Sequence, residues 1–90
     1  MRRLQSARRH VALDHSDEYL AAWSAVQRAV TAAGGRAWLF RGAAHEDQFL
    51  EFIEWADPAA PLSAEAVAAA IAELDEFARA THIEEWEEAV

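Results

Sequence analysis

Residues 36–55 read RAWLFRGAAHEDQFLEFIEW, and this stretch decides the fold. Two runs of aromatic and aliphatic residues flank a polar break at residues 45–47, which is the pattern of a β-hairpin. The second run is apolar on both faces of the predicted strand, with Phe49, Ile53 and Trp55 on one face and Leu50 and Phe52 on the other. A half-exposed antiparallel strand normally keeps one face polar. We therefore expect both faces of this sheet to be covered.

The rest of the chain predicts two helices and two further strands. Residues 8–13 alternate as a first strand. A helix follows, for which Ser16 is the expected N-cap and Gly34-Gly35 the expected end. Ser63 is the expected N-cap of a second helix over residues 64–80.

The last ten residues allow two interpretations. If the second helix continued, Ile83 and Trp86 would lie opposite Leu74 and face water. A break near Thr81 avoids this exposure, and residues 82–89 then form a fourth, edge strand rich in glutamate. With that strand the chain is an α+β protein of ferredoxin-like βαββαβ order, with a four-stranded antiparallel sheet and two helices on one face.

The uncovered face of this sheet predicts self-association. Residues 1–90 make a single domain, near the size at which association adds useful burial. Helices cover one face, and a second copy of the same sheet is the simplest cover for the other. The sequence therefore predicts a homodimer that forms a dimeric α+β barrel.

Composition excludes several classes of partner. The net charge is -8 and lysine is absent, which argues against nucleic acid as a partner. No apolar run approaches the ~20 residues of a membrane span, and no leader-like pattern opens the chain, so we expect a cytoplasmic protein with no membrane partner. Cysteine is absent, which excludes disulfides and thiolate metal sites. We expect neither a metal site nor a cofactor.

Two segments carry a resemblance to a known superfamily. RRHVAL at residues 8–13, followed directly by a helix, and DQFLEFIEW at residues 47–55, followed by a loop and an alanine-rich helix, are similar to its first and third strands. On these segments the chain resembles the dimeric α+β barrel superfamily, especially the antibiotic-biosynthesis-monooxygenase-like and stress-responsive barrel proteins. The resemblance implies two sheets packed face to face. Some members are cofactor-free oxygenases of planar phenols or quinols, and haem-degrading relatives have a histidine that residues 64–80 lack.

Candidate catalytic residues follow from that chemistry. His10 or His15 would remove a phenolic proton, and Arg41 would stabilise the resulting anion. Each histidine also has a structural interpretation, as a hydrogen-bonded core residue or a helix-entry contact. Within an apolar strand, Arg41 is expected to pair with Glu51 or Glu54 across the hairpin, or with an anionic ligand.

Aromatic residues are the candidate ligand-binding groups. Tyr19 and Trp23 recur at helical spacing and would face the sheet across a ligand-sized gap, with Trp38 or Arg41 on the hairpin closing it. The same rings could instead fill the core or a dimer interface. Two hypotheses stay open: a cofactor-free monooxygenase acting on an aromatic small molecule, and a non-catalytic barrel that binds a ligand or a protein partner.

Overall fold

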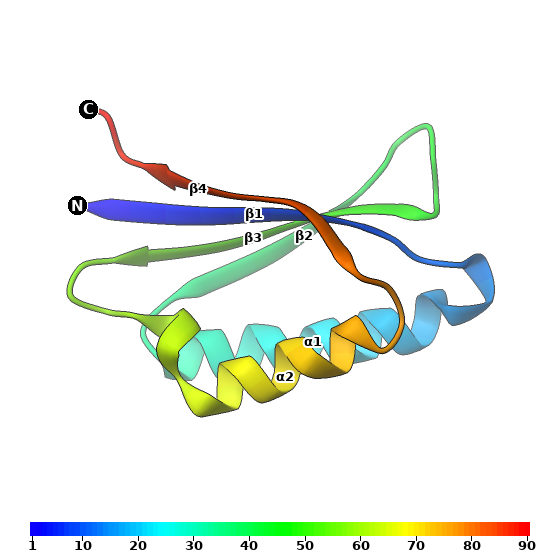
Figure 1. Ribbon diagram of the computed structural model, residues 1–90, viewed down its shortest axis with the longest axis horizontal. Coiled ribbons are helices and arrows are strands. Elements are labelled where there is room, and N and C mark those ends of the chain that lie inside the picture. Colours follow the sequence, from blue (N-terminus) through cyan, green and yellow to red (C-terminus); the bar gives the residue numbers. More distant parts are fainter.

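The computed structural model describes residues 1–90 as a four-stranded antiparallel sheet with two helices on one face (Figure 1). The elements are β1 (Arg2–His10), α1 (Ser16–Ala32), β2 (Arg36–Arg41), β3 (Gln48–Ala56), α2 (Glu65–Asp75) and β4 (Ala80–Glu87), with short 3₁₀ turns at Leu13–His15 and Pro61–Ser63. The strand order is β2-β3-β1-β4. The predicted ferredoxin-like βαββαβ fold is confirmed. No helix is long and apolar enough to cross a membrane.

The hairpin of β2 and β3 forms where the sequence predicted it. Trp38 lies opposite Phe52 and Phe40 opposite Leu50 in the antiparallel register. Along β3, alternate residues are buried against the helices, namely Phe49, Glu51, Ile53 and Trp55. Both faces of β3 are therefore apolar, as predicted, except that a carboxylate occupies one position in the buried row.

The core lies between the helices and this buried row. Helix α1 contributes Tyr19, Trp23, Val26 and Val30, and α2 contributes Val67 and Leu74. Burying each large apolar side chain contributes about 1.5–3 kcal/mol. After α1 the chain turns at Gly34, whose φ of 88° lies in the left-handed region that favours glycine.

Several predicted boundaries were wrong. β1 covers residues 2–10 instead of 8–13, because it pairs with β3 along its whole length, from Arg2 opposite Ala56 onward. Ser16 is the first residue of α1 and makes no capping hydrogen bond, since a 3₁₀ turn precedes it. Ser63 likewise lies in a 3₁₀ turn, and α2 covers only residues 65–75.

The predicted break before the last strand is confirmed, although β4 begins and ends two residues earlier than expected. Its pairing with β1 shifts by one residue between Ser6 and Arg8, which is the mark of a β-bulge, and His82 there has a φ of 50°. Beyond the bulge, Ile83 faces the helices while the Trp86 indole donates a 3.0 Å hydrogen bond to the Ser6 hydroxyl.

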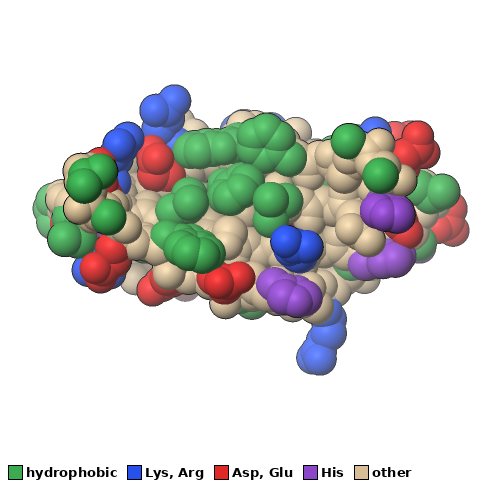
Figure 2. Space-filling view, turned by 90° about the horizontal axis from the view of Figure 1, so that it is seen from above, with side chains coloured by type: hydrophobic (Ala, Val, Ile, Leu, Met, Phe, Trp, Pro, Cys, Tyr) green, Lys and Arg blue, Asp and Glu red, His purple; other side chains and the backbone are tan.

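The face of the sheet away from the helices is apolar at its centre (Figure 2). We call it the open face, and its large apolar residues are Leu4, Trp38, Phe40, Leu50, Phe52 and Trp86. Phe40 packs edge-on against Phe52, with ring centroids 5.7 Å apart, yet remains 55% exposed. Exposure of this kind indicates an interaction surface. Its cover by a second copy remains a prediction.

Candidate functional site

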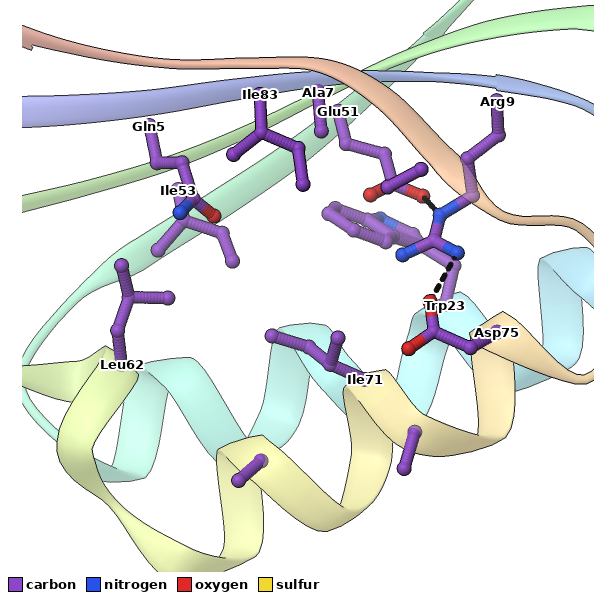
Figure 3. Close-up of a pocket in the computed structure, with 13 residues that line it drawn as sticks. Gln5, Ala7, Arg9, Trp23, Glu51, Ile53, Leu62, Ile71, Asp75 and Ile83 are labelled. Atoms are coloured by element: carbon purple, nitrogen blue, oxygen red, sulfur yellow. Dashed lines mark hydrogen bonds and ion pairs between the residues drawn. The ribbon is translucent and has the colours of Figure 1, made fainter.

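A cavity of about 380 Å³ lies between the sheet and α2 (Figure 3). Its lining is mostly apolar: Gln5, Ala7, Arg9, Trp23, Glu51, Ile53, Leu62, Ala68, Ile71, Ala72, Asp75, Ala80 and Ile83. Trp23, Ile53 and Glu51 are buried, whereas Ile83 at the rim is 58% exposed. The volume lies within the range of small-molecule pockets, about 300–1,000 Å³. The tryptophans therefore do not fill the space between the helices and the sheet.

The polar end of the cavity is held by Arg9. Its Nε donates a 2.7 Å hydrogen bond to Glu51 Oε2, and its Nη1 donates to Asp75 Oδ1 at 2.7 Å and to the Ala78 carbonyl at 2.6 Å. The Arg9 side chain is only 2% exposed, while that of Asp75 is 53% exposed. Figure 3 shows the guanidinium bridging the two carboxylates across the gap between sheet and helix.

Tyr19 completes this group from the side of α1. Its hydroxyl donates a 2.6 Å hydrogen bond to Glu51 Oε2, which thus accepts from both Tyr19 and Arg9. Burial, followed by the nearby Glu51 carboxylate, raises the pKa of Tyr19. Burial also raises the pKa of Glu51, although the hydrogen bond from Tyr19 and the Arg9 charge act in the opposite direction. A carboxyl group of raised pKa at the end of a cavity is a candidate proton acceptor.

The local sequence explains why these groups meet. Alternate residues of β1 point toward the helices, so Ala7 and Arg9 share one face. Because Ala7 is the register partner of Glu51, Arg9 lies diagonally across from that carboxylate and reaches it. On α2, Ala68 and Ala72 line the cavity with short side chains and so leave its volume open.

The predicted aromatic ligand-binding residues do not come together. Trp23 lines the cavity. Tyr19 is fully buried and contacts Phe49, with ring centroids 4.7 Å apart, and it acts on the cavity only through Glu51. Trp38 lies on the open face beside Phe52. The expectation that Trp38 closes a pocket with Trp23 is therefore wrong, because alternate strand residues point to opposite faces.

None of the predicted catalytic residues lines the cavity. His10 is exposed, with Nε2 2.8 Å from Asp47 Oδ2, and His15 lies at the start of α1 with Nδ1 3.5 Å from Glu18 Oε1. Arg41 is exposed, with its guanidinium 5.2 Å from the centre of the Phe49 ring. His10 and Arg41 instead line a second hollow of about 420 Å³ at the hairpin-turn end of the sheet.

Arg41 forms no ion pair with either predicted partner, Glu51 or Glu54; its guanidinium lies over Phe49, and Arg9 pairs with Glu51. Arg9, Glu51 and Asp75 were not predicted as site residues from the sequence. One signal was present: Glu51 interrupts the buried row of β3, and a buried carboxylate needs a partner. Arg9 lies inside the strand predicted over residues 8–13, but the sequence does not reveal the register with β3 that brings it to Glu51. No group of three or more histidine, aspartate or glutamate residues is placed to hold a metal ion.

Comparison with known proteins finds no matching family model and no curated protein of matching sequence. Solved structures match over almost the whole chain. SnoaB, a cofactor-independent oxygenase from Streptomyces nogalater, is 14% identical, with 99% of this chain and 94% of that chain covered and a TM-score of 0.80. A conserved protein from Methanosarcina mazei is 10% identical, with 98% and 93% covered and a TM-score of 0.84. An antibiotic biosynthesis monooxygenase is 14% identical, with 100% of both chains covered and a TM-score of 0.77.

These similarities confirm the fold that the resemblance implied. The chain has the α+β fold of antibiotic-biosynthesis-monooxygenase-like structures. At such low identity the likeness establishes the fold, and activity has to be argued from the residues of the site.

Proposed function

We propose that the chain is a homodimeric, cofactor-free monooxygenase that acts on a planar phenol or quinol bound in the cavity. The observation that carries the proposal is the position of Glu51, a buried carboxyl group of raised pKa at the polar end of the cavity, which Trp23 also lines. Cofactor-free oxygenation needs such a proton acceptor, an aromatic wall and limited access of water. The oxygenase of similar fold supports this class of reaction.

In the proposed reaction, the phenolic hydroxyl lies against Glu51, which takes its proton. The substrate anion passes an electron to O₂, and the two radicals combine at a ring carbon ortho or para to the hydroxyl that bears a hydrogen atom. Loss of water then leaves a quinone, so that one oxygen atom of O₂ is retained and the other departs with two hydrogens of the substrate. Arg9 stabilises the anion through its charge. Glu51 and Arg9 thus take the roles that the sequence suggested for the histidines and Arg41.

The proposed homodimer is supported by the open face. Trp86 and Phe40 are about half exposed there, although both are large apolar residues. A second sheet packed on this face would bury them and close the barrel. The cavity lies on the other side of the sheet, so each copy would hold its own.

A non-catalytic, ligand-binding barrel is the second candidate. It is favoured by the two hydrogen bonds that Glu51 Oε2 already accepts, because ion-pair networks of this kind also serve purely structural roles. Under this alternative the same cavity binds an aromatic molecule without turnover.

Oxygen consumption separates the two candidates. Wild-type protein is mixed with a panel of hydroquinones and anthrones, and uptake of O₂ is followed together with quenching of tryptophan fluorescence. Turnover that is lost in Glu51→Gln but kept in Glu54→Gln, its neighbour on the opposite face of β3, supports the oxygenase. His10→Ala, His15→Ala and Arg41→Ala should keep their activity, since none of these residues lines the cavity. Quenching of tryptophan fluorescence without O₂ uptake favours the binding barrel. Absence of both quenching and O₂ uptake would contradict both candidates.

A further inference from the structure

Three polar atoms at the polar end of the cavity have no hydrogen-bond partner in the protein. Arginine carries five N–H groups, and Arg9 uses one at Nε and two at Nη1. The remaining two are on Nη2, and no bond is found for them. Figure 3 shows this guanidinium nitrogen directed into the cavity. The Arg9 side chain is only 2% exposed, so this N–H donor is held on a buried side chain.

Glu51 and Trp23 present the other two atoms. Both bonds to Glu51 end on Oε2, so Oε1 is free to accept, and Figure 3 shows it on the cavity side of the carboxylate. The indole N–H of Trp23 also makes no bond within the protein, although the residue is only 5% exposed. No fully enclosed side-chain nitrogen or oxygen lacks a partner. These atoms therefore have accessible surface, and for buried residues that line the cavity this surface faces its interior.

The charges around these atoms decide which ligand group fits. One guanidinium, Arg9, faces two carboxylates, Glu51 and Asp75, so the polar end carries no net positive charge. An anion placed there would gain one contact with Nη2 and lose more to the adjacent Oε1 lone pairs. A neutral hydroxyl fits both atoms, because its oxygen accepts from Nη2 while its O–H donates to Oε1.

We infer that this cavity selects aromatic ligands that carry a neutral hydroxyl group at its polar end and that it rejects aromatic carboxylates of the same size. The inference rests on the cavity of the proposed function and specifies its ligand. Arg9 and Glu51 are the specificity-determining pair, and a buried site built to bond a hydroxyl discriminates strongly against groups that leave its polar atoms unpaired. A phenol bound in this way donates its hydroxyl proton to Glu51 Oε1 in a hydrogen bond before any reaction begins.

Isothermal titration calorimetry near pH 7 with three two-ring probes tests the inference: 2-naphthol, 2-naphthoate and 2-methylnaphthalene. Wild-type protein should bind 2-naphthol at least about tenfold more tightly than either of the others, which corresponds to one hydrogen bond to a charged group. Glu51→Gln replaces the free acceptor by an amide N–H₂ and removes one negative charge. This variant should weaken the binding of 2-naphthol about tenfold and strengthen the binding of 2-naphthoate, so that 2-naphthoate becomes the preferred ligand.

Two further variants keep the test decisive. Asp75→Asn also removes a negative charge beside Arg9, so it should strengthen binding of 2-naphthoate. Because Asp75 bonds Nη1 and its replacement leaves Nη2 and Oε1 unchanged, Asp75→Asn should weaken binding of 2-naphthol much less than Glu51→Gln does. Glu54→Gln is the matched control and should behave as wild type. Equal binding of 2-naphthol and 2-methylnaphthalene, or preference for 2-naphthoate, would overturn the inference while leaving the cavity as a binding site. Failure of all three probes to bind contradicts the cavity itself, and with it the proposed function.

Discussion

Arg9 on β1 and Glu51 on β3 are joined by a 2.7 Å hydrogen bond within the layer between sheet and helices. Both residues are buried, and Arg9 also reaches Asp75 on α2, so one side chain ties two strands to a helix. Removing Arg9 from this network leaves Glu51 as an uncompensated buried charge. The stability of the fold and the properties of the cavity therefore depend on the same residues.

Arg9→Met should destabilise the protein by about 3–5 kcal/mol, because Glu51 loses its cationic partner while remaining buried. Methionine keeps much of the apolar stem, so the loss reports mainly on the charge. Urea unfolding followed by circular dichroism gives the free energy of unfolding. Arg8→Met is the matched control: Arg8 is exposed, and its replacement should change stability by no more than about 0.5 kcal/mol. Equal effects of the two substitutions would contradict a structural role for the network.

Tyr19→Phe should cost about 1.5–3 kcal/mol of stability, since it deletes a 2.6 Å hydrogen bond to a carboxylate and keeps the ring packed on Phe49. A double-mutant cycle with Glu51→Gln isolates this bond. In the Glu51→Gln background the same substitution should cost only about 0.5–1.5 kcal/mol, because the acceptor is neutral. Identical costs in both backgrounds would show that the hydroxyl acts through something other than Glu51.

The fold was predictable because hydrophobic periodicity reports local structure directly. The alternation around Phe52 and the break at residues 45–47 identified the hairpin, and the phase of Trp86 relative to α2 indicated the change from helix to strand. The extent of β1 was not predictable in this way. Its first residues, including Arg2 and Arg3, are polar and form a strand only because β3 supplies a partner along their whole length.

The site was less predictable, because it depends on contacts between distant segments. Trp23 was identified correctly as a residue facing the sheet, since helical spacing determines which side it lies on. Arg9 and Asp75 are 66 positions apart, and no local pattern links them. The histidines attracted attention through their chemistry alone, yet His10 and His15 lie at exposed strand and helix ends, where sequence gives no measure of burial.

The stability of wild-type protein relative to Glu51→Gln should fall as pH rises. The fold raises the pKa of Glu51 above its ordinary 4.5, so the folded state holds this proton more tightly than the unfolded state. The contribution is fully present below the ordinary value and is lost as pH increases through the folded value. Urea unfolding of both proteins between about pH 4 and pH 8 measures the difference. Glu54→Gln is the control for removing a charge from the same strand. If the stability of wild type relative to Glu51→Gln increased with pH, the folded state would instead lower the pKa of Glu51, as the charge of Arg9 would do.

Phe40→Glu should convert a dimer into a folded monomer, because it places a charge on the open face while leaving the core between helices and sheet untouched. Light scattering after size exclusion should give about twice the monomer mass for wild type and the monomer mass for the variant, with unchanged circular dichroism. Leu13→Glu is the control, since Leu13 is as exposed as Phe40 but lies in the turn before α1. The cavity lies on the other side of the sheet, so the Phe40→Glu monomer should still bind 2-naphthol. A wild-type monomer at micromolar concentration would contradict the barrel, whatever the variants do.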